Sequence, residues 1–223
     1  MSSKRYRFVI TGRTPLIMHA DSIDWADKME AWKNDAKNKQ DSRAGDDRTP
    51  AFRWTGCLYM DEKHVVIPSD YITRMLMGAA ARVPIPGGRN GKTFKQGAMS
   101  GMMVEEPHIA LLVGDGKQPI PREKIDALLT EKDFDKHRSA ASKLGFNLFV
   151  KRAKIGQSKH IRVRPKFDKW GCTGHITVWD DKLAQALPEI AEIAMREIGL
   201  GDWRPSASTP GPYGCGTMEV AHA

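Results

Sequence analysis

Hydrophobic and polar positions alternate over several short segments of this chain, a pattern typical of β-strands with one buried face. The first such segment, residues 5–10, ends at the turn signal Thr11-Gly12. Further strands are predicted over residues 108–113, 144–150, 160–167, 172–179 and 217–220. We also expect residues 52–60 and 63–67 to pair as a hairpin around Asp61-Glu62.

Apolar residues at helical spacing predict several helices. The first is an amphipathic helix over residues 22–38. Pro68-Ser69-Asp70 is a helix-start signal, so a second helix is expected to begin there. A short helix is predicted over residues 122–129. A longer one is predicted over residues 182–198, with a bend or restart at Pro188.

Without its insertions, the predicted chain order is β-α-β-β-α-β, the order of ferredoxin-like and RNA-recognition domains. We therefore predict a single α+β domain over residues 1–223 with a ferredoxin-like (RRM-like) core. Three excursions from this core are expected: a helical insertion at 21–50, a basic loop at 84–101 and a basic hairpin at 144–169. A chain of 223 residues is long enough to bury such a core.

The positive charge of the chain is concentrated in two short stretches. The formal net charge is +8, and residues 151–169 carry eight Lys or Arg against the single acid Asp168. Residues 82–95 add four Lys or Arg without an acid and are rich in glycine. A solvated surface usually mixes both signs, whereas dense positive charge attracts a polyphosphate backbone. The charge pattern therefore favours nucleic-acid binding.

The sequence lacks the common catalytic and metal-binding motifs. It contains no Walker loop, dinucleotide fingerprint, Gly-x-Ser-x-Gly elbow or His-Glu-x-x-His. Its cysteines are odd in number and far apart, so free thiols are expected at Cys57, Cys172 and Cys215. Cys172 and His175 lie three apart on one predicted strand and fall on opposite faces. We therefore expect no metal site and no cofactor.

The sequence gives no sign of a membrane or secretory segment. No apolar run approaches the ~18 residues of a membrane span. The N-terminus leads into the first predicted strand without a secretory apolar region. We therefore expect a cytoplasmic protein.

Three local patterns occur in an order typical of one superfamily. The first is ITGRTPLIMH at 10–19, where a Thr-Pro-Leu stretch follows the first strand. The second is VVIPSDYITRMLMGAA at 65–80, the entry into the helix that begins near Pro68. The third is the glycine-rich GLGDWRPSASTPGPYGCG at 199–216, before the last strand. Together these segments resemble the RAMP superfamily, whose members form the RNA-binding subunits of CRISPR effector complexes.

The resemblance implies a protein of antiviral defence that binds single-stranded, crRNA-like RNA without cutting it. Subunits of this type lie side by side along the strand, so a homo-oligomer or filament is expected, with other effector-complex subunits as further partners. Some backbone subunits cut RNA with an aspartate before the first hairpin, but Trp54-Thr55 stand there in this chain. A stand-alone or phage-borne relative fits the same motifs.

The candidate nucleic-acid-binding residues come from both basic stretches and from the motifs. Ser69, at a helix start, could hold a phosphate, and Trp203, Arg204 and Tyr213 could stack a base or clamp the strand. The cations expected to hold phosphates are Arg89, Lys92, Lys95, Arg152, Lys154, Lys159, Arg162, Arg164 and Lys166. The glycines that would admit a close strand are Gly199, Gly201, Gly211, Gly214 and Gly216.

Two alternative functions stay open at this stage. One is a RAMP-type, metal-independent endoribonuclease in which His19 or His160 transfers protons. The other is a structural or assembly protein, such as a phage component, whose basic face binds an acidic protein partner. RNA is favoured over DNA as the bound strand, because the RAMP superfamily that the motifs resemble binds RNA.

Overall fold

The main sheet forms from antiparallel strands that alternate buried and exposed side chains. The computed structural model describes residues 3–41, 43–88 and 91–223. Strand β1 (Lys4–Gly12) lies between β11 (Gly216–His222) and β10 (Trp170–Val178), and β4 (Met102–Val104) pairs with the other edge of β10. The short strands β6 (Leu112–Val113) and β7 (Gln118–Pro119) extend the sheet beyond β10.

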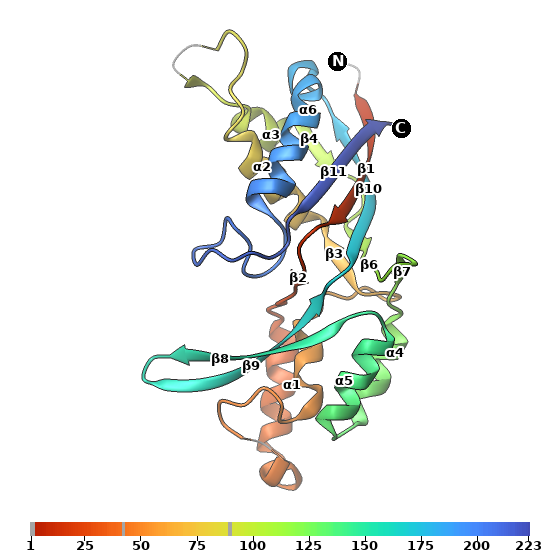
Figure 1. Ribbon diagram of the computed structural model, residues 1–223, viewed down its shortest axis with the longest axis vertical. Coiled ribbons are helices and arrows are strands. Elements are labelled where there is room, and N and C mark those ends of the chain that lie inside the picture. Colours follow the sequence, from red (N-terminus) through yellow and green to blue (C-terminus); the bar gives the residue numbers. More distant parts are fainter. Residues whose placement is uncertain (1–2, 42, 89–90) are drawn as a thin grey trace.

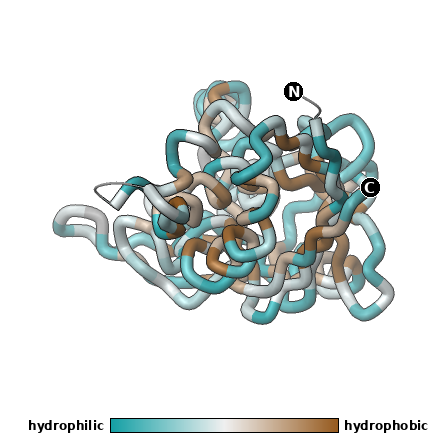
Figure 2. Tube along the Cα trace, turned by 90° about the horizontal axis from the view of Figure 1, so that it is seen from above, coloured by the Kyte–Doolittle hydropathy of each residue, from teal (hydrophilic) through white to brown (hydrophobic). Residues whose placement is uncertain are grey.

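Helices cover one face of this sheet. These are α2 (Ser69–Ala80), α3 (Lys95–Gly101) and α6 (Asp181–Ile193), which continues as a π-helical turn over Ala194–Ile198 (Figure 1). Phe8 and Ile10 of β1 are buried beneath Leu76 of α2 and Leu187 of α6 in a single apolar core. Figure 2 shows hydrophobic positions mainly inside the molecule and hydrophilic ones mainly at its periphery.

The α+β class predicted from the sequence is confirmed. Strands β1, β4, β10 and β11, with α2 and α6 between them, follow one another as β-α-β-β-α-β. In the sheet they are ordered β11-β1-β10-β4. The opposite face of the sheet carries alternate residues such as Arg5 and Arg7, both exposed.

A second group of elements lies at one end of this core. Its sheet has the order β2-β9-β8, formed by β2 (Leu16–Ile17), β9 (Ser158–Phe167) and β8 (Asn147–Ile155). Around it lie α1 (Ile23–Asn34), η1 (Ala36–Asp41), η2 (Ala51–Cys57), α4 (Arg122–Asp126), η4 (Ala127–Thr130) and α5 (Phe134–Lys143). Strands β3 (Val66–Pro68) and β5 (His108–Ala110) form a separate pair.

Two predicted segments differ from the structure. The strand predicted over 52–60 is wrong, because most of it forms the 3₁₀ helix η2. There Trp54 is buried beside His137, and Phe52 packs edge-on against Trp25. The basic stretch 84–101 is also not all loop, since its last seven residues form α3.

Three segments project from the same side of the molecule. They are the described parts of the loop before α3 (residues 81–88 and 91–94), the loop before β11 and the tip of the β8–β9 hairpin, all on the left of Figure 1. They lie at different heights along the longest axis, with the loop before β11 in the middle. In the described ranges, no helix combines the length and apolar character needed to cross a bilayer.

Candidate nucleic-acid interface

The basic hairpin and the glycine-rich loop meet at an aromatic cluster. The Nζ atom of Lys151 on β8 lies 3.5 Å from the centre of the Trp203 ring. The ring centres of Trp203 and Tyr213 are 5.5 Å apart, and those of Phe149 and Tyr213 are 6.1 Å apart. The Trp203 and Tyr213 rings are tilted by 33° to each other. Proteins that bind single strands combine aromatic rings, on which bases stack, with cations that contact phosphates.

Close backbone packing fixes the loop that carries Trp203. The amide of Asp202 donates to the carbonyl of Ile17 (2.8 Å), which ties the loop to β2. Gly201 has φ +76°, and a Cβ there would lie 2.5 Å from the same Ile17 oxygen. A Cβ on Gly211 would lie 2.3 Å from Trp203. Glycine is therefore required at both positions, because a side chain would clash with Ile17 at position 201 and with Trp203 at position 211.

The other predicted glycines hold the same loop against the core. Gly199 and Gly214 have positive φ angles of 73° and 72°. Gly214 donates to the carbonyl of Pro15 (2.8 Å). Gly216 begins β11 and pairs with Gly12. Gly214 and Gly216 thus hold the loop against Pro15 and β1.

Three exposed cations on the hairpin are available for phosphates. Arg152, Lys154 and Lys159 are exposed, and none of them pairs with a carboxylate in the described part of the chain. Lys154 and Lys159 face each other across the hairpin, next to its turn. A cavity of about 400 Å³ runs between this hairpin and the loop, lined by Lys151, Arg152, Lys154 and Trp203 among others.

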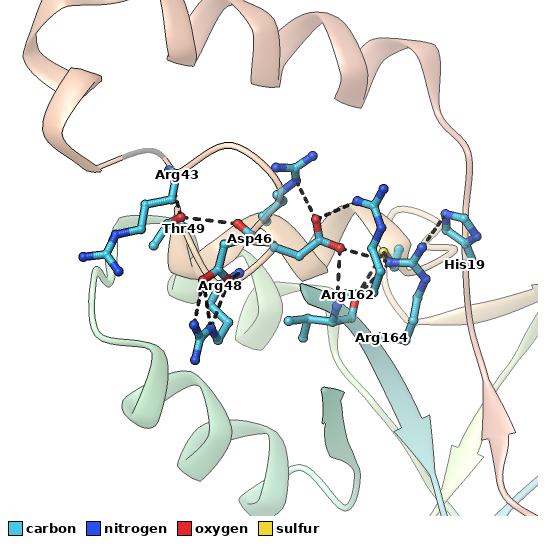
Figure 3. A network of polar contacts seen from close by, with 11 residues as sticks. His19, Arg43, Asp46, Arg48, Thr49, Arg162 and Arg164 are labelled. Atoms are coloured by element: carbon cyan, nitrogen blue, oxygen red, sulfur yellow. Dashed lines mark hydrogen bonds and ion pairs between the residues drawn. The ribbon is translucent and has the colours of Figure 1, made fainter. Parts of the chain in front are cut away.

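Arg162 and Arg164 have a different role from the exposed cations, because both contact the buried carboxylate of Asp47. Arg162 Nη1 donates to Oδ1 of Asp47 (3.0 Å), and Arg164 Nη1 lies 3.5 Å from Oδ2. The Asp47 side chain is only 5% exposed. The Val163 amide also donates to its Oδ2 (3.3 Å). Figure 3 shows this network, with Arg162, Arg164 and His19 lying in a row.

The arginine network still carries an excess of positive charge. Arg53 contributes a third guanidinium, with Nε 3.5 Å from Oδ1 of Asp47. The second carboxylate nearby, that of Asp202, lies 4.0 Å from Nε of Arg164. Three guanidiniums thus face two carboxylates. The carboxylates hold the arginine side chains in place, and the N–H groups that they do not engage can bind an anion.

His19 borders this network in a defined tautomer. Nη2 of Arg164 lies 3.1 Å from Nε2 of His19. Because a guanidinium can only donate, Nε2 must accept, so the ring proton is on Nδ1. Burial and the nearby charge of Arg164 lower the pKa of His19. His19 is therefore a neutral side chain whose acceptor nitrogen is already occupied.

Three cavities adjoin one another along this side of the molecule. The cavity between hairpin and loop shares Arg162 and Arg164 with one of about 290 Å³ beside η2 and α1. It shares Asp202 with a third, of about 120 Å³, at the start of α2. Together they form a groove that we call the hairpin groove.

Two predicted residues, Lys166 and Ser69, do not line the hairpin groove, and Arg204 lines its third cavity but is engaged by its own loop. Lys166 pairs with Asp168 (2.9 Å) on another surface. Arg204 donates to Ser206 and to the Gly201 carbonyl, so it stabilises its own loop. The Ser69 amide donates to the Pro107 carbonyl (3.0 Å) and is not available for a phosphate.

The cations of the second basic stretch lie at the other end of the molecule. Lys92 and Lys95 are exposed next to α3 and line none of the three cavities (Figure 1). Arg89 lies outside the described residues. His160, the other histidine candidate, packs over Gly45, where an added Cβ would lie 2.8 Å from its Nδ1.

The sequence pattern did not indicate Asp47, Arg53 and Lys151 as site residues. Asp47 lies between the helix predicted over 22–38 and the strand predicted over 52–60, where no element was predicted, and its partner Arg162 is 115 positions away. Lys151 was counted in the charge run, but its position over Trp203 depends on the packing of two distant segments. Among the described residues, no group of three or more His, Cys, Asp or Glu side chains could hold a metal.

Comparisons with known proteins give only weak similarity. No family model matches the chain, and no curated protein matches it. One structural neighbour is a chain of Type III-B Cmr-beta bound to cognate target RNA and AMPPnP, with 11% identity and a TM-score of 0.33. The match covers 97% of this chain and 63% of that one. Cmr6 from Pyrococcus furiosus matches with 10% identity and a TM-score of 0.35, over 100% of both chains. At these TM-scores the superpositions carry no functional argument.

Proposed function

We propose that this protein binds single-stranded nucleic acid in the hairpin groove without cutting it. The observation that carries the proposal is the cluster of Lys151, Trp203 and Tyr213 next to the exposed cations Lys154 and Lys159. Bases stack on such rings for about 1–3 kcal/mol each, independently of sequence. The cations supply the salt-dependent phosphate contacts.

The strand is inferred to be RNA, and the subunits to lie side by side along it. Both inferences follow from the resemblance to the RAMP superfamily noted in the sequence. The three projecting segments on one side of the molecule suit a strand longer than the hairpin groove (Figure 1). In that arrangement Lys92 and Lys95 contact only nucleic-acid strands that extend beyond the hairpin groove. Affinity is therefore expected to rise with strand length.

The test is a titration of fluorescently labelled single strands, followed by anisotropy at several salt concentrations. The double variant Lys154→Gln/Lys159→Gln should weaken binding of all sequences. It should also lower the salt slope by about 0.7 for each lysine that contacts a phosphate. The matched control Lys124→Gln/Lys182→Gln removes the same charge from exposed lysines on α4 and α6 and should leave the slope unchanged. Equal effects of the two double variants would contradict the proposal.

Strand type and assembly are tested by two further titrations. Single-stranded DNA and duplex RNA of the same length should bind more weakly than single-stranded RNA, since neither presents unstacked bases together with 2′-hydroxyls. Light scattering during chromatography should show particles whose mass grows with strand length. A monomer at every strand length would contradict side-by-side assembly.

The two alternatives are not favoured by the geometry of the candidate residues. For His19 to take a proton from a ribose hydroxyl, Arg164 must first leave its Nε2 atom. An assembly protein that binds an acidic partner would need exposed positive charge. It would not need the aromatic rings of Trp203 and Tyr213 beside Lys151. Incubation with hairpin RNA without metal tests the first, and assembly after nuclease treatment tests the second.

A further inference from the structure

The cavity of about 290 Å³ in the hairpin groove is bordered by three elements that each carry positive charge. Residues of α1, η2 and β9 line it. Its lining cations are Lys33, Arg53, Arg162 and Arg164. It adjoins the cavity between hairpin and loop, because Arg162 and Arg164 line both. A strand bound along the hairpin can therefore extend into it.

Two of the arginines converge on a single carboxylate oxygen. Nη1 of Arg162 donates to Oδ1 of Asp47 (3.0 Å), and Nε of Arg53 lies 3.5 Å from the same atom (Figure 3). The two guanidiniums come from β9 and η2, so this shared contact holds side chains from distant segments close together. One negative charge shared by two guanidiniums leaves an excess of positive charge at this point.

Most N–H groups of these two arginines have no acceptor among the described residues. A guanidinium carries five N–H donors, and Arg162 uses one of them, while Arg53 directs only its Nε toward Asp47. The side chains of Arg53 and Arg162 are 28% and 30% exposed, so a ligand can reach them. Arg164 is more fully engaged, because its Nη1 contacts Asp47 and its Nη2 lies 3.1 Å from Nε2 of His19. The open donors of the cavity are therefore those of Arg53 and Arg162.

The charge of the lining matches a dianion. Within the part of the chain that the structure describes, four cations and the two carboxylates of Asp21 and Asp47 line the cavity, a formal balance of +2. A phosphate monoester carries about −1.5 to −2 at pH 7 and offers three acceptor oxygens. A phosphodiester carries only one negative charge. In a nucleic acid, a phosphate monoester occurs only at the end of a strand.

We propose that this cavity binds the terminal phosphate monoester of a strand that lies in the hairpin groove. The guanidiniums of Arg53 and Arg162 donate to its oxygens, and Lys33 adds a third cation. The proposal rests on the proposed function, since the strand delivers the phosphate. A free nucleoside monophosphate presents the same chemical group, so the experiment separates these two sources.

The test measures by anisotropy how tightly the full-length protein binds short single-stranded RNA with a phosphate or a hydroxyl at one end. The fluorophore is attached at the opposite end, and both ends are tested in turn. Phosphorylation of one end should tighten binding about tenfold, near the lower limit for hydrogen bonds to a charged group. A strand two nucleotides longer with a hydroxyl end gains a similar charge. It should bind less tightly than the phosphorylated strand.

Variants assign this effect to the cavity. Arg53→Gln and Lys33→Gln should each lower the ratio of the two affinities toward one. The matched control Lys37→Gln removes an exposed lysine on η1 that does not line the cavity, and should keep the ratio. Arg53→Lys keeps the charge but loses the planar fork, so its ratio should be intermediate. Lys154→Gln/Lys159→Gln should weaken both strands equally and keep the ratio.

The outcomes separate this proposal from the proposed function. Equal affinities with and without a phosphate at either end, or the same ratio in wild type and Arg53→Gln, would overturn the cavity proposal and leave strand binding intact. A second measurement records the Tm with adenosine monophosphate. If this nucleotide raises the Tm of wild type but not of Arg53→Gln, while the strand ends make no difference, the strand end is refuted as the ligand in favour of a free nucleotide. If no strand binds and the Tm does not change, both proposals fail.

Discussion

Replacing Asp47 by alanine should destabilise the protein more than any change to an exposed ion pair. The substitution leaves Arg53, Arg162 and Arg164 without the carboxylate that all three contact. Loss of one partner from a buried ion network costs about 3–5 kcal/mol. The three arginine side chains are 28%, 30% and 17% exposed, so water replaces part of the lost interaction. We therefore expect a loss of about 2–3 kcal/mol.

Urea unfolding followed by far-ultraviolet circular dichroism measures this loss as a fall in the free energy of unfolding. Thermal unfolding should show a Tm lower by about 4–12 °C, at about 2–4 °C per kcal/mol for a chain of this size. Asp168→Ala is the matched control, because Asp168 is 45% exposed and pairs with Lys166. It should cost less than about 1 kcal/mol. The reasoning would be refuted if Asp47→Ala were no more destabilising than Asp168→Ala.

Three other predictions follow from single side chains. Trp203→Ala should weaken single-strand binding about 5- to 150-fold in anisotropy titrations, while Trp203→Phe should retain most of the affinity. Because the pKa of His19 is lowered in the folded state, the unfolded chain binds this proton more readily. The free energy of unfolding should therefore fall as the pH drops below about 6.5, and less steeply in His19→Gln; equal slopes would contradict this. His137→Phe leaves the buried N–H of Trp54 without its acceptor (3.1 Å), so urea unfolding should show a loss of about 1–3 kcal/mol.

Elements whose pattern is local were predicted from the sequence. The strands predicted over 144–150 and 160–167 lie mostly within β8 and β9, because Val163, Pro165 and Phe167 are buried while the residues between them are not. The helix predicted over 182–198 is α6 with its π-helical end, whose buried Leu183, Leu187 and Ile190 recur at helical spacing.

Elements that depend on distant partners were not predicted. Phe52 and Trp54 alternate with polar residues as in a strand, but in η2 they pack against residues of α1 and α5. Helix α5 buries only His137 and Ala141 among its described residues, so its apolar periodicity is too weak to indicate a helix.

The candidate site was predicted in its parts but not in its connections. Trp203 and Tyr213 were expected to form a stacking surface, and their rings lie 5.5 Å apart. The sequence pattern does not indicate that Lys151 lies over Trp203. It also does not indicate that Arg162 pairs with Asp47 and is not an exposed cation. Both contacts join segments that are far apart in the sequence and meet only in the folded protein.

Mapping where a bound nucleic-acid strand touches the protein shows directly whether the strand lies in the hairpin groove. The measurement is photo-crosslinking of single-stranded RNA that carries 4-thiouridine, followed by mass spectrometry of the linked peptides. Binding in the hairpin groove predicts crosslinks in residues 147–167 and 199–215, the hairpin and the loop that border the groove. Crosslinks confined to the open face of the main sheet, around Arg5 and Arg7, would contradict it. That face is the one on which RNA-recognition domains stack their bases.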